Sequence, residues 1–459
     1  MATIASYLPE SQIITLSKDF PALTDPEKLV GFTNPEQFGF FLHEWIHFLH
    51  NISTINGFSL FSSQIILWSN FRWTMNNKEV SDGSGNIDQN NIKGNERVLS
   101  YIISNRKWHQ CNLPSYLKES NFYFESSQIH DMEVVDEQVY STSLIKCTIN
   151  YSDNKYSINI GVLEILESVA FMLECECVKK MNGTPQDAPF YPYHIIKKLA
   201  GSIAPSLSDK IITCCMLASL QSNNPPQILY ELLKESESLS VKCRYKNLVS
   251  RVKKQLTEQD ENINKTFTQV NSLFPVDEPM GRFVKLTLSR IKNNLIFRKS
   301  NPFYELNIIK KVSKQVESMN DFIKQFGGCT IIQKRDDDEE KPLCDVMYDF
   351  ELPENDESTL FGSKMLRACF HFILLHYKPS GEIINTLSLG VSSKNKCPFY
   401  TVCGSNIRTS NSNVCAESPW KSMRINDNKD CYYASAIKAT NPPVNLVKDN
   451  TDSDKGSNS

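Results

Sequence analysis

Two histidines and a glutamate near the N-terminus could together bind a metal ion and activate a water molecule on it. They are His43, Glu44 and His47, within the stretch FGFFLHEWIHFLHN that runs from Phe38 to Asn51. Residues four apart in an α-helix lie one turn apart on the same face, so both imidazoles could bind one zinc ion. Glu44 would lie beside them, where a carboxylate can accept a proton from a water molecule that the metal activates. The spacing therefore indicates a catalytic zinc site.

The residues around this motif predict a buried helix. Apolar side chains such as Phe41 and Trp45 cover nearly every other direction round it. Two histidines and a carboxylate are costly to bury without partners, and a bound cation supplies them. Asn34 and Pro35 suit the cap and the first position of the helix, whereas Gly39 weakens it by about 1 kcal/mol relative to alanine. The alternative is that the histidines are hydrogen-bonded members of an ordinary core.

A second stretch carries an acidic stripe that needs a cation. VLEILESVAFMLECECVKK, residues 162–180, follows a segment with the alternating pattern of β-strands. Read as a helix, it places Glu164, Glu167 and Glu174 within one sector, while the other directions are mostly apolar. Buried carboxylates require positively charged partners. This helix is therefore expected to meet a cationic group.

The two motifs together resemble a known family. HExxH followed on a later helix by Glu-x-x-Ala, here Glu167 to Ala170, is similar to the gluzincin branch of the zincin metallopeptidases. The match covers about a third of the chain; its first motif is specific, and its second is common in helices. The resemblance implies that His43, His47 and Glu167 bind zinc and that Glu44 is the general base.

Five further side chains are candidates for supporting roles. The resemblance implies that Glu174 or Glu164 steadies a ligand histidine from outside the metal site. His50 lies on the ligand face of the predicted helix, where it could contact substrate, act as the third ligand or only hydrogen-bond to a carboxylate. Tyr193 or His194 could donate to a developing oxyanion, as zincins often arrange, although both also suit ordinary packing.

Four cysteines near the C-terminus form a separate set. Cys397, Cys403, Cys415 and Cys431 stand in a Gly-, Ser- and Asn-rich segment that has too little apolar material to form a core. A bound metal would supply the missing stability, either a second zinc ion or an iron–sulfur cluster. The spacing lacks the CxxC pairs of zinc ribbons and resembles the cysteine-bearing tail of oligopeptide-transporter ATPases, which implies a [4Fe-4S] cluster. Free thiols or redox-formed disulfides are the alternative.

Composition narrows the class of protein. The chain has 459 residues, a formal net charge of -3 and 40% hydrophobic residues, which gives no general attraction to nucleic acid. Its start lacks the basic and apolar regions of a secretory signal, and no segment reaches the length of a membrane span. We therefore expect a cytoplasmic protein with no membrane partner. Residues 241–315 are locally basic, so an acidic partner or nucleic acid there is a minority interpretation.

The expected fold is α+β and mainly α-helical, with a zincin-like core, a small β-sheet, a helical region and a C-terminal cysteine module. The predicted divisions are a metal-binding core at 1–200 with a mobile loop at 76–96 and a β region at 121–160, a helical region at 201–390 with an acidic loop at 335–341, the cysteine module at 391–443 and a disordered tail at 444–459.

The sequence thus predicts a zinc-dependent hydrolase, with a metallopeptidase acting on a peptide or protein as the first hypothesis. In this hypothesis Glu44 is the general base. Two alternatives remain open. One is a zincin fold used as a binding or regulatory module without peptidase activity. The other is a structural or redox protein organised by the C-terminal cysteines, in which HExxH is a coincidence.

Overall fold

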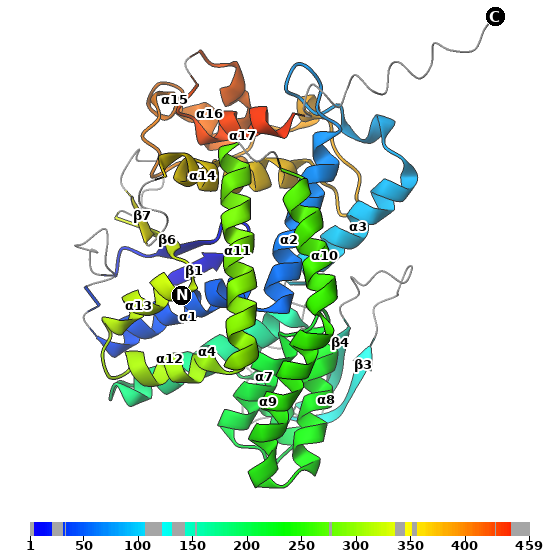
Figure 1. Cartoon of the computed structure of the whole chain (residues 1–459), viewed down its shortest axis with the longest axis vertical. Helices are drawn as coiled ribbons and strands as arrows, with labels where there is room; N and C mark the ends of the chain where they lie inside the picture. Colours follow the sequence, from blue (N-terminus) through cyan, green and yellow to red (C-terminus); the bar gives the residue numbers. More distant parts are fainter. Residues whose placement is uncertain are drawn as a thin grey trace, which may run out of the picture.

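A computed structural model describes most of the chain. The described residues are 4–20, 31–32, 34–105, 122–130, 143–151, 154–274, 278–335, 345–350, 356–426 and 428–441. Within them the fold is α+β and mainly helical, as predicted, with one four-stranded and one three-stranded sheet. The long helix α11, Pro279–Ser300, runs through the middle of the molecule (Figure 1). The predicted tail at 444–459 and residues 336–341 of the predicted acidic loop lie outside the described residues.

The HExxH stretch forms helix α1, Pro35–Ser53, and the helix begins as predicted. The side-chain oxygen of Asn34 accepts a hydrogen bond from the backbone N–H of Gln37 at 2.8 Å. Pro35 occupies the first turn, where its missing N–H costs no hydrogen bond. Most side chains of α1 are buried, so its apolar residues hold the two histidines inside the protein.

Helix α4, Val162–Lys180, packs directly against α1. Gly39 lies at the closest point, because a Cβ atom there would be 2.6 Å from Cγ2 of Val178 and 3.3 Å from Cγ of Glu174. The glycine that weakens α1 as an isolated helix therefore allows the glutamates of α4 to approach its histidines.

Replacing this glycine should loosen the contact between the two helices. We expect Gly39→Ala to lower the free energy of unfolding by about 1–3 kcal/mol, because the added methyl group must displace Val178. Gly201→Ala in α6, Ile195–Ile203, is the matched control: no atom lies within 4 Å of its Cβ position. The free energy of unfolding of Gly201→Ala should rise by up to about 1 kcal/mol from helix propensity alone. Urea unfolding measures this free energy for both variants, and a Gly39→Ala protein as stable as Gly201→Ala would contradict the close packing.

A three-stranded antiparallel sheet leads into α4. Its strands are β3, Phe122–His130, β4, Leu144–Tyr151, and β5, Asn154–Ile160, in the order β3-β4-β5. They lie within the region where the alternating pattern predicts strands. Only Gly161 separates β5 from α4, so this sheet fixes where the glutamate helix begins.

A four-stranded sheet brings distant parts of the chain together beside α1. Its order is β1, Ala5–Leu8, β2, Ile13–Leu16, β6, Cys329–Gln333, and β7, Val346–Phe350. Strands β2 and β6 are parallel, and β1 is an edge strand that packs against α1. The pairing of β2 with β6 joins segments more than 300 residues apart.

Helices make up the rest of the described chain. Their bounds are α2 Ile55–Arg72, α3 Gln89–Ser104, α5 Phe190–Tyr193, α7 Asp209–Ser219, α8 Pro225–Ser238, α9 Val241–Glu258, α10 Asp260–Ser272, α12 Tyr304–Val312, α13 Ser318–Phe326, α14 Glu357–His376, α15 Asn406–Ser410, α16 Ser412–Glu417 and α17 Tyr432–Thr440. One cluster of buried apolar side chains runs from Ile13 to Ile437, so the three predicted regions share a core. Their boundaries stay a prediction. Among the described helices, none combines the length and apolarity needed to cross a membrane.

The interpretation of residues 76–96 as one loop is wrong. A short 3-10 helix covers Gly83–Asn86, and α3 already begins at Gln89. The buried Asn95 explains the error: its side-chain oxygen accepts a hydrogen bond from Asn70 at 2.8 Å, so a polar residue occupies a core position of α3. The apolar side of this helix becomes visible in the sequence only at Val98, after the polar run has ended.

Candidate metal site

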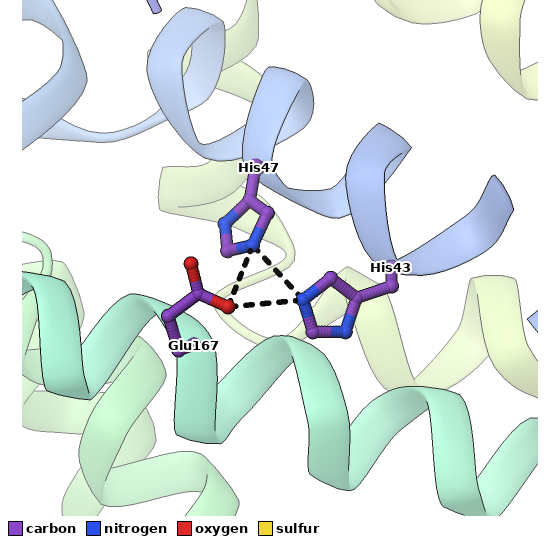
Figure 2. A group of neighbouring side chains, drawn as sticks. All are labelled: His43, His47 and Glu167. Atoms are coloured by element: carbon purple, nitrogen blue, oxygen red, sulfur yellow. Dashed lines mark hydrogen bonds and ion pairs between the residues drawn. The ribbon is translucent and has the colours of Figure 1, made fainter. Parts of the chain in front are cut away.

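His43 and His47 of α1 point toward Glu167 of α4 (Figure 2). The two Nε2 atoms are 3.1 Å apart, and Oε2 of Glu167 lies 3.2 Å from Nε2 of His43 and 3.5 Å from Nε2 of His47. Across the described ranges, this is the one group of three or more histidine, cysteine or acidic side chains that comes close enough to hold a single metal ion.

The spacing of the three atoms fits a zinc ion. Bonds of about 2.0–2.2 Å from tetrahedral zinc to nitrogen and oxygen place neighbouring ligand atoms about 3.3–3.6 Å apart. The separations between the ligand atoms of His43, His47 and Glu167 run from 3.1 to 3.5 Å. Nε2 of His43 faces two such atoms, and a single N–H cannot donate well to both. One metal ion would satisfy all three groups.

Glu174 holds His43 from the other side. Its Oε2 lies 3.0 Å from Nδ1 of His43, the ring nitrogen that faces away from Glu167. Donation from Nδ1–H to a carboxylate leaves Nε2 with a lone pair and fixes the orientation of the ring. Glu174 therefore occupies the position that the resemblance assigns to a residue steadying a ligand histidine.

The site carries excess negative charge. In the described part of the chain, no lysine or arginine forms an ion pair with Glu44, Glu167 or Glu174. Burial would lower the pKa of His43, but the carboxylates of Glu167 and Glu174 raise it well above its usual value. Burial also raises the pKa of Glu44, against the opposing effect of His43 and His47. Glu174 is buried, Glu44 and Glu167 are half-buried, and carboxylates with so little access to water favour a nearby cation.

Tyr193 is the candidate hydrogen-bond donor that lies nearest to these ligands. Its ring centroid is 5.9 Å from that of His43, and burial raises the pKa of its hydroxyl. His194 instead packs with its ring 4.9 Å from the ring of Phe171. Of the two residues that the sequence offers for this role, Tyr193 has the better position.

Tyr7 was missed by the sequence interpretation. Its ring stacks on that of His47, with centroids 6.5 Å apart and planes at 13°, and its hydroxyl accepts a hydrogen bond from Asn51 at 2.8 Å. Tyr7 belongs to β1, which is an edge strand of the four-stranded sheet among the described residues. No motif marks it, because only the packing of β1 against α1 brings it to the site.

His50 does not join the group of ligand atoms. It lies seven residues after His43, within about 20° of the same direction round the helix but two turns further along it, and its Nε2 is 3.7 Å from Oε1 of Glu305. Glu305 is already bound to Arg298 at 2.6 Å. Burial, together with the charge of Arg298, lowers the pKa of His50. Neither ring nitrogen of His50 has a hydrogen-bond partner among the described residues, so the expected hydrogen bond to a carboxylate is not formed there. The supporting role of His50 stays a prediction.

Glu164 has a different role from Glu174. Its side chain accepts hydrogen bonds from the backbone N–H of Gly161 at 2.7 Å and from the hydroxyl of Tyr191. These contacts fix the start of α4 and its junction with β5. Of the two glutamates that could steady a ligand histidine, Glu174 is the one in contact with His43.

The four C-terminal cysteines line one small cavity near α17. Cys415 and Cys431 are buried, while Cys397 and Cys403 are half-buried. No three of these thiols lie within 4.8 Å of one another, in contrast to the ligand atoms between α1 and α4. Arg408 lines the same cavity and is 1% exposed.

Comparison with known proteins leaves the chain unassigned: no family model matches it, and searches of curated proteins and of solved structures gave no match. Its function therefore has to be argued from the geometry of the site.

Proposed function

We propose that the chain is a zinc-dependent hydrolase that cleaves peptide bonds, with zinc held by His43, His47 and Glu167. The observation that carries the proposal is the convergence of these three side chains at separations that suit tetrahedral zinc. The surrounding fold supports a zincin-like arrangement. The HExxH helix lies against an edge strand and packs on a second helix that carries the proposed third ligand, a glutamate.

The residues round the triad can carry out hydrolysis. When bound, zinc supplies a Lewis acid that lowers the pKa of a water molecule toward about 7 and polarises a carbonyl group. Glu44 accepts the proton from the attacking water and passes it to the leaving amine. Glu174 keeps Nδ1 of His43 protonated, and Tyr193 is near enough to stabilise developing negative charge on the carbonyl oxygen.

The proposal is tested by incubating the zinc-loaded chain with a broad peptide library and identifying new termini by mass spectrometry. Cleavage that stops when zinc is removed and returns when zinc is restored would support it. A chain that binds zinc at this site but cleaves no peptide would instead be a binding or regulatory module.

We also propose that Cys397, Cys403, Cys415 and Cys431 bind an iron–sulfur cluster. Arg408 favours this second candidate: it is a buried cation whose Nη2 has no hydrogen-bond partner in the described residues. Its Nε donates to the backbone oxygen of Tyr400 at 2.6 Å, which leaves the positive charge without an anion. A cluster with four thiolate ligands is anionic and would supply one.

The local backbone also suits a cluster. Backbone N–H groups donate to the sulfur atoms of Cys397, Cys403 and Cys431, a contact that tunes and stabilises metal thiolates. A single zinc ion, with bonds of about 2.3 Å to sulfur, would hold the thiolates about 3.8 Å apart. No three of these thiols lie within 4.8 Å of one another, so they are not arranged as the ligands of one zinc ion.

Anaerobic purification should yield a brown protein with about four iron and four sulfide ions per chain. We expect Cys403→Ser to lose most of the visible absorbance, because serine is a poor ligand for iron in such clusters. Cys243→Ser, which changes an exposed cysteine outside the cavity, is the matched control and should keep it. Stoichiometric zinc that depends on Cys403 would identify a zinc site instead, and absence of any metal would leave four free thiols.

A further inference from the structure

A surface groove lies near the triad, separated from it by Tyr193. Its volume of about 620 Å³ is within the range typical of ligand sites. Helices α4, α6, α7 and α12 border it, and α4, α7 and α12 lie close together in Figure 1. Part of its surface is apolar, with Phe171, Met172 and Leu306 among the lining residues. The groove is therefore large enough for several residues of a peptide.

The groove is positively charged. Five lysines line it, against the two carboxylates of Glu176 and Asp209, an excess of three positive charges. Both carboxylates are already paired, with Lys180 at 2.5 Å and with Lys197 at 3.0 Å. Three lysines of the groove remain, Lys179, Lys210 and Lys310. All three are exposed, and none forms an ion pair with another described residue.

Tyr193 connects the groove with the metal site. It lines the groove, and the same ring lies 5.9 Å from the ring of His43, although no ligand side chain lines the groove itself. Phe171 packs on Tyr193 with ring centroids 5.4 Å apart, so an apolar part of the groove lies beside this tyrosine. A chain bound in the groove would therefore pass Tyr193 before it reached the ligand side chains.

We propose that this groove binds an acidic segment of the substrate polypeptide and places the neighbouring peptide bond at the triad. Aspartate or glutamate side chains of the substrate would face Lys179, Lys210 and Lys310, where opposite charge also speeds encounter. Apolar parts of the same segment would lie on Phe171 and Leu306. The groove is a substrate site only if the proposed function holds, because the bond to be cleaved must meet zinc at the same triad.

Binding is tested with the Glu44→Gln protein, which should retain zinc and leave the probe intact. The probes are fluorescent decapeptides, one rich in aspartate and glutamate and one rich in lysine, followed by fluorescence anisotropy. We expect the protein to bind the acidic peptide more tightly than the basic one, and its affinity for the acidic peptide to fall as the salt concentration is raised. Adding Lys179→Glu and Lys310→Glu should lower this affinity about tenfold at low salt, since both reversals place like charges against the peptide.

The matched control adds Lys253→Glu and Lys292→Glu, which reverse two exposed lysines on α9 and α11 outside the groove. Equal effects of the two double variants, or no preference for the acidic peptide, would overturn the proposal. Single-stranded DNA that displaces the acidic peptide and binds more tightly would also overturn it, in favour of a nucleic-acid groove.

Failure of the groove proposal and failure of the hydrolase proposal can be told apart. If wild type cleaves peptides and the Lys179→Glu, Lys310→Glu variant does so with unchanged KM, only the groove proposal is refuted. If the acidic peptide binds as expected but wild type cleaves no peptide, the hydrolase proposal is refuted and the groove remains a binding site for acidic polypeptides.

Discussion

Glu44→Gln should abolish measurable peptide cleavage while the protein still binds one zinc ion per chain. Glutamine keeps nearly the same shape but cannot accept a proton, and general acid–base catalysis contributes about 10²–10⁴-fold to the rate. Glu44 is adjacent to His43 but does not belong to the group that could ligate the metal, so the zinc content should not change. Hydrolysis of a fluorogenic peptide and metal analysis by mass spectrometry measure the two quantities separately.

The control for this variant is Glu258→Gln, which changes an exposed residue on α9 whose ion pair in the described part of the chain is with Lys254 of the same helix, at 3.7 Å. It should cleave peptides at the wild-type rate. A Glu44→Gln protein that retains more than about a tenth of the activity would exclude Glu44 as the general base. One that has also lost its zinc would show that Glu44 acts on metal binding, and the loss of activity would then say nothing about proton transfer.

The part of the site that was predictable from the sequence depends on local rules. Helix α1 and its Asn34 cap follow from residues a few positions apart, and the spacing of His43 and His47 follows from the helix itself. The acidic stripe of α4 indicated a cationic partner, and Glu167 and Glu174 do meet the two sides of His43. Gly39, a weak point in the helix pattern, turned out to permit that approach.

The part that was not predictable depends on pairings between distant segments. Strand β6 joins the N-terminal sheet from more than 300 residues away, and Tyr7 reaches His47 only because β1 packs against α1. His50 shows the opposite case. Its sequence position suggests a place among the metal ligands, but in the structure it lies beside the buried Arg298–Glu305 pair, whose residues come from later helices. Local spacing restricts which residues can meet, whereas long-range packing decides which do.

Substitutions at Glu167, Glu174 and Glu176 should affect zinc binding in that order. All three lie on α4, but Glu167 is in the triad, Glu174 contacts only the far side of His43, and Glu176 pairs with Lys180 in the groove. We expect Glu167→Ala to lose stoichiometric zinc. Glu174→Gln should bind zinc about 10–100-fold more weakly, because it changes the partner of a ligand rather than a ligand. Glu176→Gln should match wild type. Competition with a chromophoric chelator measures the affinities.

Thermal unfolding gives an independent reading of the same series. Zinc at 100 times its Kd stabilises the folded chain by about 2.7 kcal/mol if it binds only the folded form, so a chelator should lower the Tm of wild type. Glu167→Ala should still fold, because it removes a half-buried carboxylate that lacks a lysine or arginine partner in the described residues. Its Tm should be the same with and without zinc. If Glu167→Ala instead bound zinc with wild-type affinity, the third ligand would have to be another group, and the triad could not be the metal site on which the proposed hydrolysis depends.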